Sequence, residues 1–171
     1  FMLDSRGRNT AALAALNIAD GSAKILGENK QADVSGALTH PTENHIQAYS
    51  ANYDRVKWTV LDPAIESDFK YLDGVAEGDF NVGSRTLDDT KWIVSYMMDN
   101  GPVRFYLYDR PSKKATFLFT NNERLADVQL AKMNPVVIKS RDGMNLVSYL
   151  TLPANEGNAR KPRPGKPLPL V

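Results

Sequence analysis

The residue types that most often carry out chemistry are scarce in this chain. It has two histidines, His40 and His45, and no cysteine among its 171 residues. Two histidines without a third ligand at a useful spacing predict no metal site. The lack of cysteine excludes disulfides, thiolate metal ligands and a cysteine nucleophile, but it does not indicate a cellular compartment.

The usual sequence signatures of a nucleophile or of phosphate binding are also missing. No serine lies in a Gly-x-Ser-x-Gly pattern, which would expose it on a strand-to-helix turn. No glycine-rich loop that would cradle phosphates precedes an expected helix. We therefore predict no catalytic, cofactor-binding or metal-binding residue in this sequence.

Three aspartates recur at the ends of expected hairpins: Asp20, Asp62 and Asp109, which are 42 and 47 residues apart. A carboxylate at such a position accepts hydrogen bonds from the backbone of the following turn. We expect all three to cap turns and not to act in catalysis.

The elements that position these residues are predicted to be short antiparallel strands. Three hairpins have largely apolar strands joined by short polar turns, and Asn100-Gly101 is a strong turn signal. The paired segments are Phe1–Asp4 with Thr10–Ile18, His45–Ser50 with Val56–Leu61, and Lys91–Met98 with Val103–Tyr108. Outer strands are expected at Ala23–Leu26 and Ala115–Phe119.

A repeat relates two of these units. Gly36, Thr39, Ile46 and Tyr49 align without gaps on Gly83, Thr86, Ile93 and Tyr96, at an offset of 47 residues. A period of about 40–50 residues with short apolar strands is typical of a β-propeller blade. The aligned position of His45 is Trp92, which favours a packing or surface role for this histidine.

One helix interrupts the strands. Asp62 followed by Pro63 is a typical helix start, and Ile65, Phe69 and Leu72 fall on one face before Gly74. We predict a short amphipathic helix over Pro63–Asp73, docked on a sheet where the outer strand of its blade would otherwise run.

The fold class is accordingly all-β and mostly antiparallel. Residues 1–120 are expected to form a partial propeller of about three blades, with units at about 1–30, 31–78 and 79–120. Residues 121–171 are expected to hold a polar linker with a possible helical turn, and then a hairpin of Val136–Ser140 with Leu146–Leu152 across Arg141-Asp142-Gly143. A last strand, Leu168–Val171, stops unfinished, so we expect a piece of a longer protein.

Charge and hydropathy indicate which partners to expect. The 21 basic and 20 acidic residues nearly balance, which predicts no general attraction to nucleic acid or to anionic membranes. The one basic cluster, Arg160–Lys166, is proline-rich and without aromatic residues, as in a solvated linker. No apolar stretch approaches the roughly 18–20 residues that span a bilayer.

The C-terminal part resembles a known family. The segment Pro135–Pro153, which contains Arg141-Asp142-Gly143 and Tyr149-Leu-Thr-Leu-Pro153, is followed by Lys166–Val171. Together they resemble the passage from propeller to peptidase domain in the prolyl oligopeptidase family of serine peptidases, in its acylaminoacyl-peptidase and dipeptidyl-aminopeptidase branch. The resemblance implies that the hairpin opens an α/β-hydrolase domain, and that the family's nucleophile, acid, histidine and His-Gly-Gly-Pro segment have no counterpart in this chain.

Two functions of different classes follow. The resemblance implies a part of an oligopeptidase whose propeller gates and selects short peptide substrates, and which is inactive alone. The alternative is a non-enzymatic β-repeat scaffold for protein partners, similar to WD-repeat propellers. In either case, exposed edges at Phe1–Asp4 and Leu168–Val171, and the phenylalanines Phe105, Phe117 and Phe119, predict self-association.

Overall fold

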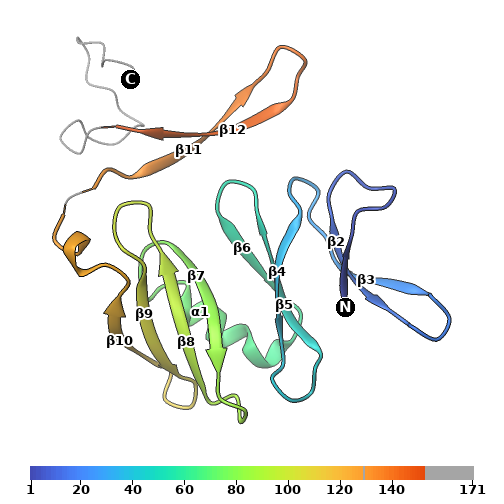
Figure 1. Ribbon diagram of the computed structural model, residues 1–171, viewed down its shortest axis with the longest axis horizontal. Coiled ribbons are helices and arrows are strands. Elements are labelled where there is room, and N and C mark those ends of the chain that lie inside the picture. The colour runs from blue at the N-terminus through green and yellow to red at the C-terminus, as the bar shows by residue number, and fades with distance from the viewer. Residues whose placement is uncertain (129, 153–171) are drawn as a thin grey trace.

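The computed structural model describes residues 1–128 and 130–152, which form four small antiparallel sheets (Figure 1). The first sheet has the strand order β1 (Met2–Asp4), β2 (Ala12–Leu16) and β3 (Ala23–Gly27). The second has the order β4 (Val34–Thr39), β5 (Ile46–Asn52) and β6 (Val56–Val60). The third has the order β7 (Asp79–Arg85), β8 (Lys91–Met97), β9 (Arg104–Asp109) and β10 (Lys114–Thr120). The last is the hairpin β11 (Met133–Lys139) and β12 (Asn145–Thr151). The expected strand Leu168–Val171 and the basic segment Arg160–Lys166 lie outside the described residues.

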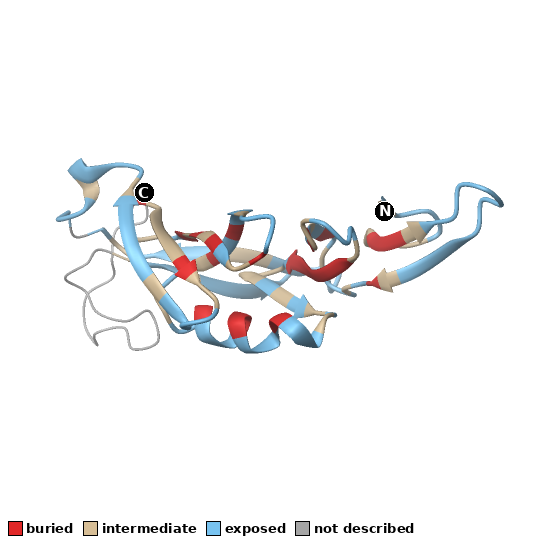
Figure 2. Cartoon of the chain, turned by 90° about the horizontal axis from the view of Figure 1, so that it is seen from below, coloured by how far each residue is buried: buried red, intermediate tan, exposed pale blue. Residues whose placement is uncertain are grey.

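The sheets are meanders, in which strands that follow one another in the chain pair side by side. The first three sheets stand in a row and do not close into a barrel (Figure 1). Seen from below, the molecule is elongated, and α1 (Glu66–Leu72) lies along one face of the row (Figure 2). The predicted class, mostly antiparallel β with a partial propeller-like arrangement and one short α-helix, is confirmed.

All three predicted hairpins are present within a few residues of their expected bounds, and so are both outer strands. The sequence did not point to β4 and β7 as strands. They pair with β5 and β8, and each has a register shift beside or at the aligned glycine of the repeat: between Val34 and Gly36 in β4, and at Gly83 in β7. A glycine is favoured at such a bulge because it adopts irregular backbone angles at little steric cost.

The predicted helix over Pro63–Asp73 is observed as a 3-10 turn, η1 (Pro63–Ile65), followed by α1. Asp62 caps it by accepting a hydrogen bond from the Ala64 N–H at 2.9 Å. The three residues predicted to form its apolar face are buried: Ile65, Phe69 and Leu72. The helix therefore docks on the sheets, as predicted, and follows β6 where a fourth strand would extend the second sheet.

Two cores hold neighbouring sheets together. The smaller lies between the first and second sheets and contains Leu13, Val34, Ile46 and Tyr49. The larger lies between the second sheet, the third sheet and α1. Its fully buried members include Trp92, Tyr96 and Tyr108, with Phe69 of α1 at its centre. Phe69 contacts the rings of Trp58, Phe80 and Trp92 at centroid distances of 5.6, 5.3 and 6.1 Å.

The connection after the third sheet contains one helical turn, η2 (Glu123–Leu125), and leads to the hairpin β11–β12. The hairpin has the predicted Arg141-Asp142-Gly143 turn, with Gly143 at a φ of +87°. Its strands pair with each other and with no strand of the other sheets. No described helix is long and apolar enough to cross a bilayer.

Candidate functional site

The two histidines form a structural pair at the start of β5. Their rings stack with centroids 5.2 Å apart. The Nδ1 atom of His40 accepts a hydrogen bond from the Glu43 N–H at 3.1 Å, and His45 Nε2 lies 3.2 Å from a carboxylate oxygen of Asp62. His45 is partly exposed, with 43% of its side chain accessible, whereas Trp92, the aligned residue of the repeat, is fully buried. Across residues 1–128 and 130–152, no three potential metal-ligating side chains converge.

The three recurring aspartates cap turns, as predicted. Asp20 accepts the Ser22 N–H at 2.8 Å, and Asp109 accepts the Ser112 N–H at 3.0 Å. Hydrogen bonds from the serine side chain and backbone lower the pKa of both carboxyls. For Asp62, hydrogen bonds from the Gln47 amide, the Ala64 N–H and His45 lower the pKa to about 2.

A buried charge network that the sequence did not predict lies at one end of the second and third sheets. Asp68 of α1 is fully buried, and it accepts hydrogen bonds from the Tyr108 hydroxyl at 2.7 Å and from Arg110 Nε at 3.0 Å. Lys113 also forms an ion pair with it. The network thus ties the helix to β9 and to the turn that follows it.

The network continues from Arg110 through a second buried carboxylate. Arg110 donates to Asp89 Oδ2 at 2.6 Å, and Arg85 donates to Asp89 Oδ1 at 3.0 Å. The Trp92 indole N–H donates to Asp89 Oδ1 at 2.8 Å. Both guanidinium groups lie over the Trp92 ring, at 4.9 Å for Arg110 and 5.7 Å for Arg85, which adds cation–π attraction.

Arg85 carries the network into the second sheet. It donates to the Gln47 side-chain oxygen at 2.7 Å and to the Thr39 carbonyl, and the Gln47 amide donates to Asp62 at 2.9 Å. Each buried charge therefore has an opposite charge and further hydrogen bonds, the condition under which buried ions are tolerated. Because its groups are already paired, the network holds elements together and is not arranged to bind a ligand.

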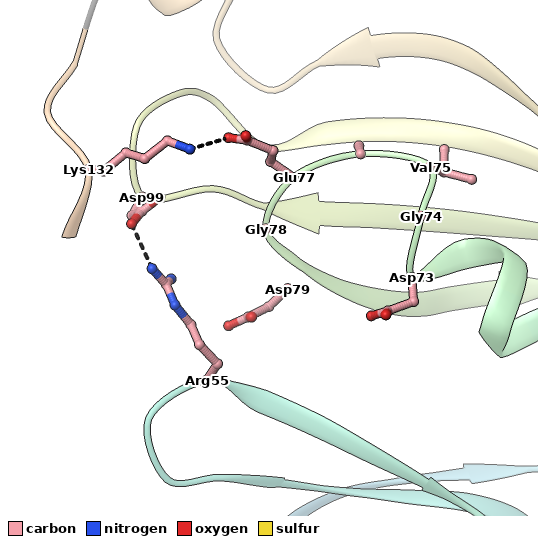
Figure 3. A pocket seen from close by; sticks show the side chains of 10 residues that line it. Arg55, Asp73, Gly74, Val75, Glu77, Gly78, Asp79, Asp99 and Lys132 are labelled. Atoms are coloured by element: carbon pink, nitrogen blue, oxygen red, sulfur yellow. Dashed lines mark hydrogen bonds and ion pairs between the residues drawn. The ribbon is translucent and has the colours of Figure 1, made fainter. Parts of the chain in front are cut away.

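The candidate site is a cleft near the other end of the same two sheets, with a volume of about 710 Å³ (Figure 3). Its ionisable lining residues are Asp73, Glu77, Asp79, Asp99, Arg55 and Lys132. Arg55 pairs with Asp99 at 2.7 Å, and Lys132 pairs with Glu77 at 2.8 Å. Four carboxylates against two cations give the cleft a net negative charge.

Glycine shapes the wall of this cleft. Gly78 has a φ of +103°, and a Cβ atom there would lie 2.3 Å from the Met97 carbonyl oxygen. A second hollow of about 660 Å³ shares Arg55, Asp73, Gly78 and Asp79 with the cleft, and Trp58 and Phe80 also line it. The described lining of both hollows contains charged and apolar side chains and no serine, cysteine or histidine.

Comparison with known proteins gives two relatives. The chain is 43% identical over all of its 171 residues to dipeptidyl aminopeptidase BIII of Pseudoxanthomonas mexicana, of which it covers 25%. Over 131 residues, 76% of the chain, it is 29% identical to dipeptidyl peptidase family member 6 of Caenorhabditis elegans, of which it covers 18%. The chain resembles one segment of a dipeptidyl aminopeptidase.

The chain spans about a quarter or less of the length of these relatives. No protein-family model and no solved structure matches it. The similarity to dipeptidyl aminopeptidases confirms the coarser part of the resemblance that the sequence motifs carried, a dipeptidyl-peptidase-like segment.

Proposed function

We propose that the chain is part of a serine peptidase of the prolyl oligopeptidase family, in its dipeptidyl-aminopeptidase branch. Residues 1–120 would contribute blades of a propeller that restricts the entry of peptides to the active site. The observation that carries this proposal is the similarity to dipeptidyl aminopeptidase BIII, which is 43% identical over the full length of the chain. Short peptides are the substrates of the whole protein.

The non-covalent contacts between the second and third sheets support a role in the selection of peptide substrates by size. A wall that excludes large substrates has to resist opening, and elements that gate active sites control both access and the exclusion of water. Here the sheets share a continuous aromatic core and the network that runs from Asp68 through Asp89 to Gln47. These contacts favour blades that stay together over blades that separate.

The hairpin β11–β12 is proposed to be the first element of an α/β-hydrolase domain. It supplies two strands and no catalytic group, so the nucleophile, the general base and the oxyanion donors come from residues beyond this chain. We propose that the 171-residue polypeptide alone hydrolyses neither peptides nor esters. Both relatives are peptidases by name, and no specific observation favours the alternative of a WD-repeat-like scaffold.

Reading the complete gene tests the assignment. Beyond the codon for Val171 we expect a His-Gly-Gly-Pro segment and, further on, Gly-x-Ser-x-Gly. A stop codon at that point, or a further propeller repeat with no such motif, would overturn it in favour of the scaffold.

The gating role is tested separately, in the protein that the complete gene encodes. Specificity constants are compared for a dipeptidyl p-nitroanilide and for a long peptide with the same N-terminal dipeptide. Arg110→Met breaks the network between α1 and Asp89. We therefore expect the specificity constant for the long peptide to rise relative to that for the p-nitroanilide. Arg6→Met, which removes an exposed ion pair with Asp4 in the first sheet, is the control. An unchanged ratio in Arg110→Met would refute gating while leaving the peptidase assignment intact.

A further inference from the structure

The hairpin β11–β12 depends on side-chain contacts for its orientation. It forms no backbone pairing with the other three sheets. It also belongs to neither of the two buried cores of the described residues. Many of its apolar side chains are about half exposed: Val137, Ile138, Leu146, Tyr149 and Leu150. A two-stranded hairpin of this kind is marginally stable by itself, so whatever fixes its base also determines where it points.

The base of the hairpin is held at one backbone unit, that of Met133, the first residue of β11. The Met133 carbonyl accepts a hydrogen bond from Arg55 Nη2 at 2.8 Å. The Met133 N–H donates to Asp99 Oδ2 at 2.8 Å. Arg55 and Asp99 are themselves paired at 2.7 Å through the same Nη2 and Oδ2 atoms. One guanidinium and one carboxylate therefore satisfy both polar groups of Met133 and each other.

The two side chains come from different sheets. Arg55 lies in the turn between β5 and β6, and Asp99 follows β8 in the third sheet, so the contact joins both sheets to the hairpin (Figure 3). Asp99 is mostly buried, with 14% of its side chain exposed. Although burial acts in the opposite direction, the hydrogen bond from Arg55 lowers the pKa of Asp99. The carboxylate is thus ionised at neutral pH, and charge-assisted hydrogen bonds are stronger than neutral ones.

Two weaker contacts flank this arrangement. Lys132, just before Met133, pairs with Glu77 at 2.8 Å, and both side chains are more than half exposed. On β12, the Tyr149 hydroxyl donates to the Asp54 carbonyl at 2.9 Å. Exposed pairs such as Lys132–Glu77 contribute little to stability. The hydrogen bonds of Arg55 and Asp99 to the Met133 backbone are therefore the main directional contact between the hairpin and the sheets.

We propose that Arg55 and Asp99 form a conformational clamp on the Met133 backbone that sets the orientation of the hairpin β11–β12 relative to the second and third sheets. When the clamp opens, the hairpin turns as a unit about its base at Met133, while the sheets keep their own packing. The clamp thus restricts rotation of the hairpin relative to the propeller-like part of the chain.

A distance measurement in the full chain tests the clamp. The chain has no cysteine, so two can be introduced for spin labels at exposed positions, Thr116→Cys on β10 and Arg141→Cys at the hairpin tip. With the clamp intact we expect one narrow distance distribution by pulsed electron resonance. In Asp99→Ala, and independently in Arg55→Met, we expect a broad or shifted distribution with unchanged far-UV circular dichroism. Asp4→Ala, which breaks the exposed pair with Arg6, is the matched control and should keep the narrow peak.

Amide exchange and a charge reversal separate a clamp on the backbone from a simple ion pair between sheets. In Asp99→Ala the Met133 amide should exchange about tenfold faster or more, because a hydrogen bond to a charged acceptor is lost. In the doubly reversed variant, Arg55→Asp with Asp99→Arg, the ion pair is restored. Asp99→Arg removes the acceptor for the Met133 N–H, and Arg55→Asp removes the donor to the Met133 carbonyl. The broad distribution should therefore persist. A narrow distribution at the original distance in Asp99→Ala, in Arg55→Met or in the reversed variant would overturn the proposal.

Discussion

Asp68 illustrates how much of this fold depends on single buried charges. Its side chain is 1% exposed and has three donors, Tyr108, Arg110 and Lys113. Removing one partner of a buried ion pair costs more than the pair contributes, because the remaining charge stays desolvated. The carboxylate is the charged group that α1 contributes to the network, and Ser67 Oγ on the same helix also accepts a hydrogen bond from Lys113, at 2.9 Å.

We expect Asp68→Asn to lower the free energy of unfolding by about 3 kcal/mol. The amide keeps the size of the side chain and one acceptor for Tyr108, but it leaves the Arg110 guanidinium without its counter-charge on the helix. Urea unfolding followed by tryptophan fluorescence measures the change. Glu66→Gln, an exposed carboxylate on the same helix, should change stability by less than about 0.5 kcal/mol. Equal effects of the two substitutions would contradict the role of the network.

Asp62 makes stability depend on acidity. Its pKa is about 2 in the folded chain against an ordinary value of 3.8, chiefly because of the Gln47 amide and the Ala64 N–H. A carboxyl whose pKa is depressed by folding stabilises the protein above its unfolded pKa, and the contribution is lost as pH falls through the folded value. Between about pH 4 and pH 2, the free energy of unfolding should fall less steeply in Asp62→Asn than in the unsubstituted chain. Parallel pH profiles for the two proteins would be inconsistent with this account.

At this scale, the turn-capping acids were predictable because a cap acts within a few residues of its own position. The network was not predictable. Asp68 and Arg110 are 42 residues apart, and Arg85 and Gln47 are 38 apart. A charge on one face of a helix looks the same in a sequence whether it faces water or an arginine from a distant strand.

Among the elements, α1 contributes Phe69 and Leu72 to the larger core. Phe69 is 5% exposed and contacts three aromatic rings from β6, β7 and β8. We expect Phe69→Ala to lower the free energy of unfolding by about 3–4 kcal/mol, through lost burial and the cavity left behind. Lys70→Ala, on the exposed face of the same helix, should change the free energy of unfolding by less than about 0.5 kcal/mol. Thermal or urea unfolding distinguishes them, and a small effect of Phe69→Ala would show that the helix is not docked as described.

The elements also show where local sequence signals fail. The hairpins with continuous apolar strands and the helix with its Asp-Pro start were all predicted close to their observed bounds. β4 and β7 were not, because their sequences Val-Ser-Gly-Ala-Leu-Thr and Asp-Phe-Asn-Val-Gly-Ser-Arg contain residues with low strand propensity. They become strands because β5 and β8 offer hydrogen-bonding edges and buried faces, which is a tertiary effect.

At the scale of the whole molecule, the exposed edge strands of the row of sheets are the surface that we expect to associate with other chains. β10 is the outer strand of the third sheet, and Phe117, Leu118 and Phe119 on it are each 41–52% exposed. Unpaired apolar edges recruit other strands, and a lysine at the edge discourages this. We expect the isolated chain to self-associate at micromolar concentration, and Leu118→Lys to shift it toward monomer. Sedimentation equilibrium that finds a monodisperse monomer of the unsubstituted chain would refute this expectation.

The most direct test of the account is the reaction of the protein that the complete gene encodes. We predict that it releases dipeptides from the N-termini of short peptides, and that a fluorophosphonate labels a serine outside residues 1–171 and abolishes this release. The 171-residue chain assayed in parallel should release nothing and take no label. Dipeptide release by the purified 171-residue chain, or a complete protein that neither releases dipeptides nor takes the label, would contradict the account.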